Sequence, residues 1–127
     1  MMSERNTRQK AAVVRVLEHA SAPLTAQGIL AKAQKRVPTL SQATVYRILK
    51  VLLKKEVVAT VQLPGEVPRY ELAGKGHHHF FRCRQCGSMY AVGGCTDLIE
   101  GLVPQGFRLE DHEVFLFGTC SSCARDT

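Results

Sequence analysis

Four cysteines in two close pairs are the residues of this sequence best suited to bind a metal. The pairs are Cys83 with Cys86 and Cys120 with Cys123, and 33 residues separate them. Four thiolates can surround one zinc ion as a tetrahedron and leave no position open for water or substrate. This spacing predicts a structural zinc site, whose binding energy stabilises the fold around it.

A run of three histidines, from His77 to His79, lies just before the first pair. Successive side chains of an extended segment point to opposite faces, so His77 and His79 share one face. His112, which precedes the last pair, can add a third imidazole. The histidines therefore predict a second metal site, and a polar loop without metal is the alternative.

The fourth ligand of this second site must come from the segment between the histidines. The candidates there are Cys95, Asp97 and Glu100. A thiolate from Cys95 would select zinc, whereas a carboxylate would also accept ferrous iron, manganese or nickel. The alternative interpretation of Cys95 is a small buried core residue.

Composition and cysteine use indicate a cytoplasmic protein. The 127 residues are 45% hydrophobic and 22% charged, as in a globular protein. No apolar run approaches the roughly 20 residues that span a membrane, and the first residues lack the apolar core of a signal peptide. In a reducing compartment, cysteines are better interpreted as metal ligands than as disulfides. We therefore expect a cytoplasmic protein without a membrane partner.

Charge is distributed unevenly along the chain. Residues 1–76 carry thirteen Lys or Arg and five Asp or Glu, whereas residues 77–127 carry four and six. The first part thus has a net charge of +8 and the second part −2, within the +6 of the whole chain. A cationic half predicts a polyanion as partner, and nucleic acid is the commonest one.

Helical spacing predicts three helices in the cationic half, over residues 8–20, over residues 25–35 after a Thr25 cap, and after a Ser41 cap. In the third helix the apolar residues that must face a core are Val45, Ile48, Leu49, Leu52 and Leu53. The opposite face carries base-edge donors, an aromatic ring and cations: Gln42, Tyr46, Arg47, Lys50 and Lys54. Helix-turn-helix proteins place their recognition helix third in such a run, which favours contact with double-stranded DNA over a solvated face.

The remaining segments predict strands and one more helix. Residues 57–63 and 69–72 read as the two strands of a wing, and residues 73–76 as a hinge. Beyond the hinge we expect strands at 80–82, 89–92, 107–109 and 114–117, and a helix at 96–102. The expected fold class is α+β, with a winged helix-turn-helix domain over residues 1–74 and a small α/β metal-binding domain over residues 75–127.

Catalysis and protein binding are two other functions to weigh. Three histidines with an open coordination position can generate hydroxide from water. The sequence has no His-Glu-x-x-His arrangement, nucleophile motif or phosphate-binding glycine loop, so we expect neither an enzyme nor a small-molecule substrate. A zinc-ribbon adaptor that binds protein stays an alternative, and salt-dependent duplex binding by the Tyr46 and Arg47 face would distinguish the two.

Five stretches, in order along nearly the whole chain, resemble the ferric uptake regulator (Fur) superfamily of bacterial metal-responsive repressors. They are residues 43–49, 70–72, 77–79, 83–87 and 117–123. The resemblance implies a homodimer with a winged helix on DNA, a C-terminal dimerisation domain with structural zinc, and a regulatory metal near the hinge. It implies that Tyr46 and Arg47 contact bases and that Arg5 reaches the minor groove. The expected DNA-binding set is Arg5, Gln42, Thr44, Tyr46, Arg47 and Lys50.

For the metal sites, the resemblance implies that the four paired cysteines hold structural zinc. His77, His79 and His112 match regulatory ligands, to which the family adds a glutamate from the following helix. That segment is a few residues shorter here, so Cys95 is the expected fourth ligand and Glu100 the alternative.

The family's other regulatory site, which bridges the two domains, departs from the pattern. At the positions of its usual ligands this sequence has Pro23, residues 73–76 and Phe80, and only Glu71 and His78 remain as possible ligands. We expect this site to be lost, which argues against a peroxide sensor. The sequence thus predicts a metal-dependent transcriptional repressor that senses zinc, with an iron-, manganese- or nickel-responsive regulator as the alternative.

Overall fold

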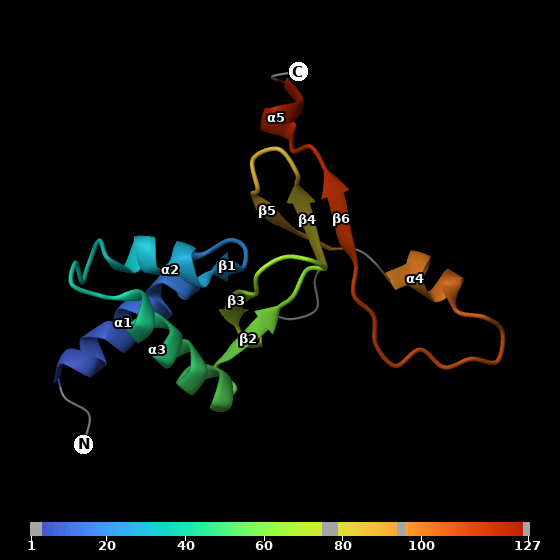
Figure 1. Cartoon of the computed structure of the whole chain (residues 1–127). Coiled ribbons are helices and arrows are strands. Elements are labelled where there is room, and N and C mark those ends of the chain that lie inside the picture. The colour runs from blue at the N-terminus through green and yellow to red at the C-terminus, as the bar shows by residue number, and fades with distance from the viewer. Residues whose placement is uncertain (1–3, 75–78, 94–95, 126–127) are drawn as a thin grey trace. The chain divides into compact units, whose positions relative to one another are not determined.

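The protein has a mixed helix and strand fold made of two compact units, Met1–Lys75 and Gly76–Thr127 (Figure 1). The structure, a computed structural model, describes residues 4–74, 79–93 and 96–125. Within these residues no helix is long and apolar enough to cross a membrane. The expected α+β class is confirmed.

Three helices form the first part of unit 1: α1 (Glu4–His19), α2 (Ala26–Ala33) and α3 (Gln42–Lys54). The Thr25 hydroxyl accepts a hydrogen bond from the Gly28 amide at 3.1 Å, and the Ser41 hydroxyl accepts one from the Thr44 amide at 3.2 Å. Each satisfies an amide that lacks a partner in the first turn of a helix, so both predicted caps are confirmed. α1 starts at Glu4, one turn before the expected position, because its first turn is polar and carries no apolar periodicity.

The three helices bury one core between them. Val45, Leu49 and Leu52 of α3 are fully buried, and Ile48 and Leu53 pack against them from the edge of the core. The predicted apolar stripe is therefore confirmed. Its partners from the other helices are Ala12, Val13, Leu17, Ala26, Ile29 and Ala33.

A small antiparallel sheet completes the winged helix. It joins β1 (Leu24–Thr25), β2 (Val58–Val61) and β3 (Arg69–Leu72) in the order β1-β3-β2. β2 and β3 lie within the expected wing strands. β1 was not predicted, because two residues are too few to show alternation and pair with β3 only once the helices are packed.

Unit 2 contains a second three-stranded sheet with β4 (His79–Cys83) in the middle. β5 (Met89–Val92) pairs with it antiparallel and β6 (Phe115–Gly118) pairs with it parallel. Two short helices, α4 (Thr96–Leu102) and α5 (Ser121–Arg125), belong to the same unit. α5 was not predicted.

The expected strand at residues 107–109 is wrong. These residues lie in an irregular stretch between α4 and β6, and Phe107 is 71% exposed. A strand needs a neighbouring strand for its backbone hydrogen bonds, and no strand of the described residues pairs with this stretch.

Candidate metal centre and nucleic-acid interface

The sheet of unit 2 brings the two cysteine pairs together. Cys83 ends β4, and its Cα partner in the parallel neighbour β6 is Gly118, two residues before Cys120. The Arg84 amide donates to the Gly118 carbonyl at 2.8 Å, which extends this pairing by one residue. Cys123 follows in the first turn of α5. The register of β4 and β6 thus brings together two cysteine pairs that are more than thirty residues apart in the sequence.

All four cysteine sulfurs lie within 4.8 Å of one another. The sulfurs of Cys86 and Cys120 are 3.8 Å apart. A tetrahedron with zinc–sulfur bonds of about 2.3 Å has sulfur–sulfur edges of about 3.8 Å, so this separation fits a shared ion. The four-cysteine cluster therefore fits a structural metal site.

Backbone amides favour the ionised form of two of these sulfurs. The Cys83 sulfur accepts hydrogen bonds from the amides of Cys86 at 3.4 Å and Cys120 at 3.3 Å, which lower the pKa of Cys83 to about 6. The Cys123 amide lowers the pKa of Cys120 in the same way. Only a thiolate binds a metal, so these amides prepare Cys83 and Cys120 as ligands. A hydrogen bond with Cys120 and burial instead raise the pKa of Cys123 to about 12.

Burial protects three of the four ligands. Cys83 is fully buried, Cys120 and Cys123 are buried beside it, and Cys86 is exposed. The three buried sulfurs form a cluster of their own in unit 2. Around such a cluster, water has little access to compete for a bound ion.

Two of the predicted regulatory ligands meet in the described part of unit 2. The rings of His79 and His112 have centroids 4.8 Å apart, and His79 is only 4% exposed. Glu100 is exposed on α4. The other two predicted ligands, His77 and Cys95, lie outside the described residues.

His79 also supports the start of β6. Its Nδ1 accepts a hydrogen bond of 3.1 Å from the Val114 amide, while the Val114 carbonyl accepts one from Phe80 at 3.2 Å. A backbone amide can only donate, so Nδ1 carries its lone pair there and the proton of the neutral ring sits on Nε2. The His79 side chain therefore gives the Val114 amide, at the start of β6, the hydrogen-bond acceptor that a neighbouring strand would otherwise supply.

The predicted DNA-binding residues lie on α1 and α3 of unit 1. On α3, Gln42, Arg47 and Lys50 are exposed and Tyr46 is 48% exposed, which is unusual for a large aromatic ring. Thr44 is half-buried beside them, and Arg5 is exposed on α1. Such a combination of cations, an amide and an aromatic ring can contact both phosphates and base edges.

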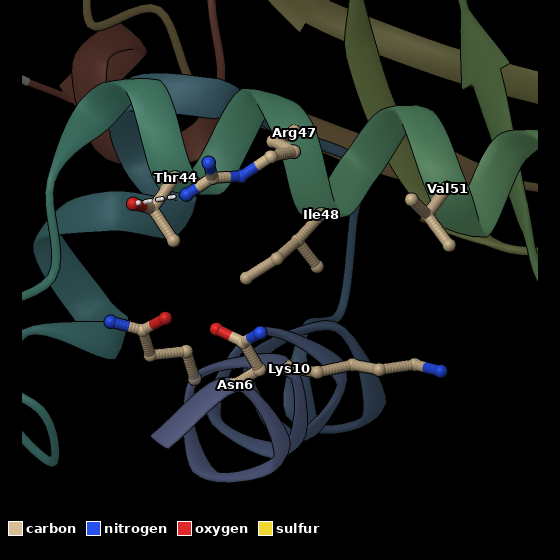
Figure 2. Close-up of a pocket in the computed structure, with 7 residues that line it drawn as sticks. Asn6, Lys10, Thr44, Arg47, Ile48 and Val51 are labelled. Carbon is tan, nitrogen blue, oxygen red and sulfur yellow. Dashed lines mark hydrogen bonds between the residues drawn. The ribbon is translucent and has the colours of Figure 1, made fainter. Parts of the chain in front are cut away.

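Between α1 and α3 lies a cleft of about 260 Å³ (Figure 2). Thr44, Arg47, Ile48 and Val51 line it from α3, and Asn6, Gln9 and Lys10 line it from α1. Sequence reasoning missed the three α1 residues. Asn6 and Lys10 are four positions apart and so share one helix face, which was the available signal.

A winged helix with a cationic third helix, joined to a unit with a four-cysteine metal site, defines a class of metal-binding DNA-binding regulators. The Ferric uptake regulator family matches residues 2–117 of the chain. The ferric uptake regulation protein of Campylobacter jejuni is 29% identical over 122 residues, which cover 92% of this chain and 78% of that protein.

Two further comparisons cover most of the chain. The zinc uptake regulation protein of Mycobacterium tuberculosis is 32% identical over 122 residues, with 94% of each chain covered. The structure of a zinc-bound manganese uptake regulator superposes with a TM-score of 0.77 at 25% identity, and covers 94% of this chain and 90% of its own.

The chain therefore belongs to the ferric uptake regulator family. It is a metal-responsive transcriptional regulator and not an enzyme. The expected family is confirmed.

Proposed function

We propose that this protein is a zinc-sensing repressor of metal homeostasis genes, which acts in the cytoplasm as a homodimer on an operator in double-stranded DNA. The carrying observation is that His79 and His112 meet in the unit that holds the four-cysteine cluster. One metal then has a structural role in the unit, and a second, exchangeable metal regulates it.

The structural ion is Zn²⁺ bound by Cys83, Cys86, Cys120 and Cys123. Four thiolates with tetrahedral separations favour zinc over harder ions. The regulatory ion is bound by His77, His79, Cys95 and His112, with Glu100 as the alternative fourth ligand. The thiolate of Cys95 favours zinc there too, and the 32% identity to a zinc uptake regulation protein supports this choice.

The operator is contacted by Arg5, Gln42, Tyr46, Arg47 and Lys50 of a domain spanning residues 1–74, and Thr44 takes part through its hydrogen bond to Arg47. A dimer presents two such domains to successive major grooves. Residues 75–127 supply the dimer contact. The exposed apolar side chains of unit 2 support this proposal, because the surface of a monomeric protein seldom exposes so many apolar side chains. These side chains are Tyr90, Leu102, Phe107, Leu109, Leu116 and Phe117.

The hydrogen bond between His79 and Val114 supplies a link from the metal to the sheet. A ring that binds a metal through Nδ1 gives up the lone pair that holds the Val114 amide. A ring that binds through Nε2 carries its proton on Nδ1, which then faces the amide proton. Either way this hydrogen bond breaks, so the metal-bound and metal-free forms differ where β6 begins.

Hydrogen exchange of the Val114 amide is therefore expected to speed up when the regulatory site fills with zinc. The Phe80 amide is the matched control, because its bond to the Val114 carbonyl does not involve the imidazole. Exchange measured by NMR at both amides checks this. A Val114 amide that stays as protected with zinc as without it contradicts the link.

Metal content tests the function itself. We expect purified protein saturated with zinc to hold two zinc ions per chain, and dialysis against a mild chelator to leave one, because four thiolates hold zinc far more tightly than a mixed site. Elemental analysis measures both states. One zinc throughout removes the zinc-sensing role, and retention of iron, manganese or nickel as the second ion favours a regulator of that metal.

Two variants identify the fourth regulatory ligand in the same assay. Cys95→Ser is expected to lose only the exchangeable zinc, and Glu100→Gln to keep it. The reverse result assigns the site to Glu100. Loss of the tight zinc in either variant would contradict the separation of the two sites.

A further inference from the structure

Three side chains at the start of α3 are joined by hydrogen bonds. The Ser41 hydroxyl donates to the Thr44 hydroxyl at 2.9 Å, and the Arg47 guanidinium donates to the same Thr44 oxygen at 3.1 Å. Figure 2 shows the Arg47 side chain lying along α3 with its guanidinium against Thr44. Ser41 itself is fixed, because its oxygen caps the Thr44 amide. The Thr44 hydroxyl thus connects Ser41, the N-cap of α3, to Arg47.

This contact sets where the guanidinium lies. Side chains of a helix lean toward its N-terminus, and a partner three residues earlier holds Arg47 in that direction. A recognition helix reads base edges with its N-terminal residues. The hydrogen bond therefore holds the guanidinium at the end of α3 that enters the groove.

The acceptor is neutral, which matters for a cation that must meet DNA. In the described part of the chain, Arg47 has no ion pair, and no acidic residue lines the cleft beside it. A carboxylate in place of Thr44 would hold the guanidinium more firmly but would cancel its charge and repel phosphates. A hydroxyl orients Arg47 and leaves its charge available.

The cleft offers the Arg47 side chain alternative positions. It lies beside the guanidinium, and Asn6 lies on its far wall (Figure 2). Gln9 also lines the cleft and is only 5% exposed. Without the Thr44 oxygen, a long flexible side chain can lie across this space in several rotamers. Fixing it again on binding costs free energy.

We propose that Thr44 is a positioning residue, which orders Arg47 for base recognition through the Ser41–Thr44–Arg47 hydrogen bonds. The inference rests on the proposed function, because it takes Arg47 as the residue that reads DNA. Thr44 acts here through Arg47 and not through a contact of its own with the duplex.

The test is a double-mutant cycle on DNA binding by the full-length protein with zinc. The probe is a duplex selected by the wild-type protein from a randomised pool, and the pool itself measures non-specific binding. Thr44→Val keeps the shape and helix preference of threonine and leaves the Ser41 cap in place, but removes the acceptor. We expect it to bind the selected duplex roughly tenfold more weakly and the pool unchanged. Thr44→Ser, which keeps the oxygen, should bind as the wild type does.

The second half of the cycle separates positioning from direct contact. In an Arg47→Ala background, Thr44→Val is expected to have no further effect, because no guanidinium is left to order. An equal loss in both backgrounds, or no loss in either, overturns the proposal. Wild-type protein that binds the selected duplex no better than the pool refutes the proposed function instead. Unchanged thermal unfolding of Thr44→Val shows that the fold is intact.

Discussion

Arg47→Ala is expected to weaken specific operator binding greatly, by close to a thousandfold, while leaving zinc content and dimerisation unchanged. A bidentate arginine contact to a guanine is worth about 1–3 kcal/mol, so a dimer that loses two loses about 4 kcal/mol, close to a thousandfold in affinity. The truncation should cost little stability because the side chain is exposed and has no ion pair among the described residues. Fluorescence anisotropy with a selected duplex and with a randomised pool measures both affinities.

Lys32→Ala is the matched control for Arg47→Ala. Lys32 is an exposed cation of the same domain, but it lies on α2. Its loss should lower affinity for the selected duplex and the pool alike, and only slightly, because it removes one long-range charge. If Arg47→Ala behaved in the same way, α3 would not be the recognition helix, and a protein-binding adaptor would become the better interpretation.

Cys83→Ser is expected to release the structural zinc and unfold unit 2. Cys83 is fully buried, and its thiolate accepts two backbone hydrogen bonds that position the turns carrying Cys86 and Cys120. A structural zinc site contributes about 10–16 kcal/mol in small domains, which equals or exceeds the whole stability of an ordinary domain. The other buried residues described in unit 2 are few: His79, Phe80, Met89, Cys120 and Cys123. A core of that size does not hold a sheet without the metal.

Unit 1 should survive this change, because its core lies within its own helices and wing. Elemental analysis and far-ultraviolet circular dichroism are expected to show loss of the tight zinc with most helix retained. Cys95→Ser makes the same chemical change at the fifth cysteine and is expected to keep the tight zinc. A Cys83→Ser protein that still holds one tight zinc and unfolds like the wild type would exclude the four-cysteine site.

Much of unit 1 was predictable because its signals are local. Thr25 and Ser41 cap helices through atoms three residues away, and the α3 stripe repeats within one helix. The strands that depend on a partner were harder. β1 is two residues long, and residues 107–109 alternate as a strand does but find no neighbour among the described strands.

For the candidate metal sites, too, local spacing was predictive and contacts with distant residues were not. Cysteine spacing alone indicated four ligands for one ion, because a Cys-x-x-Cys turn brings its own two sulfurs together whatever surrounds it. For the histidines, spacing indicated a shared face for His77 and His79 but not the chemical state of either ring. That depends on the Val114 amide, which lies 35 residues from His79 along the chain.

The sequence by itself determined the three helices of unit 1, the cationic face of the third helix, the ligand types and the family, because each rests on residue identity and short-range spacing. The tertiary structure alone decided the rest. The pairing of β4 with β6 placed Cys86 and Cys120 at 3.8 Å, and the packing of α1 against α3 made the cleft beside Arg47. These are contacts between distant segments, whose geometry is fixed by strand register and core packing and not by any local pattern.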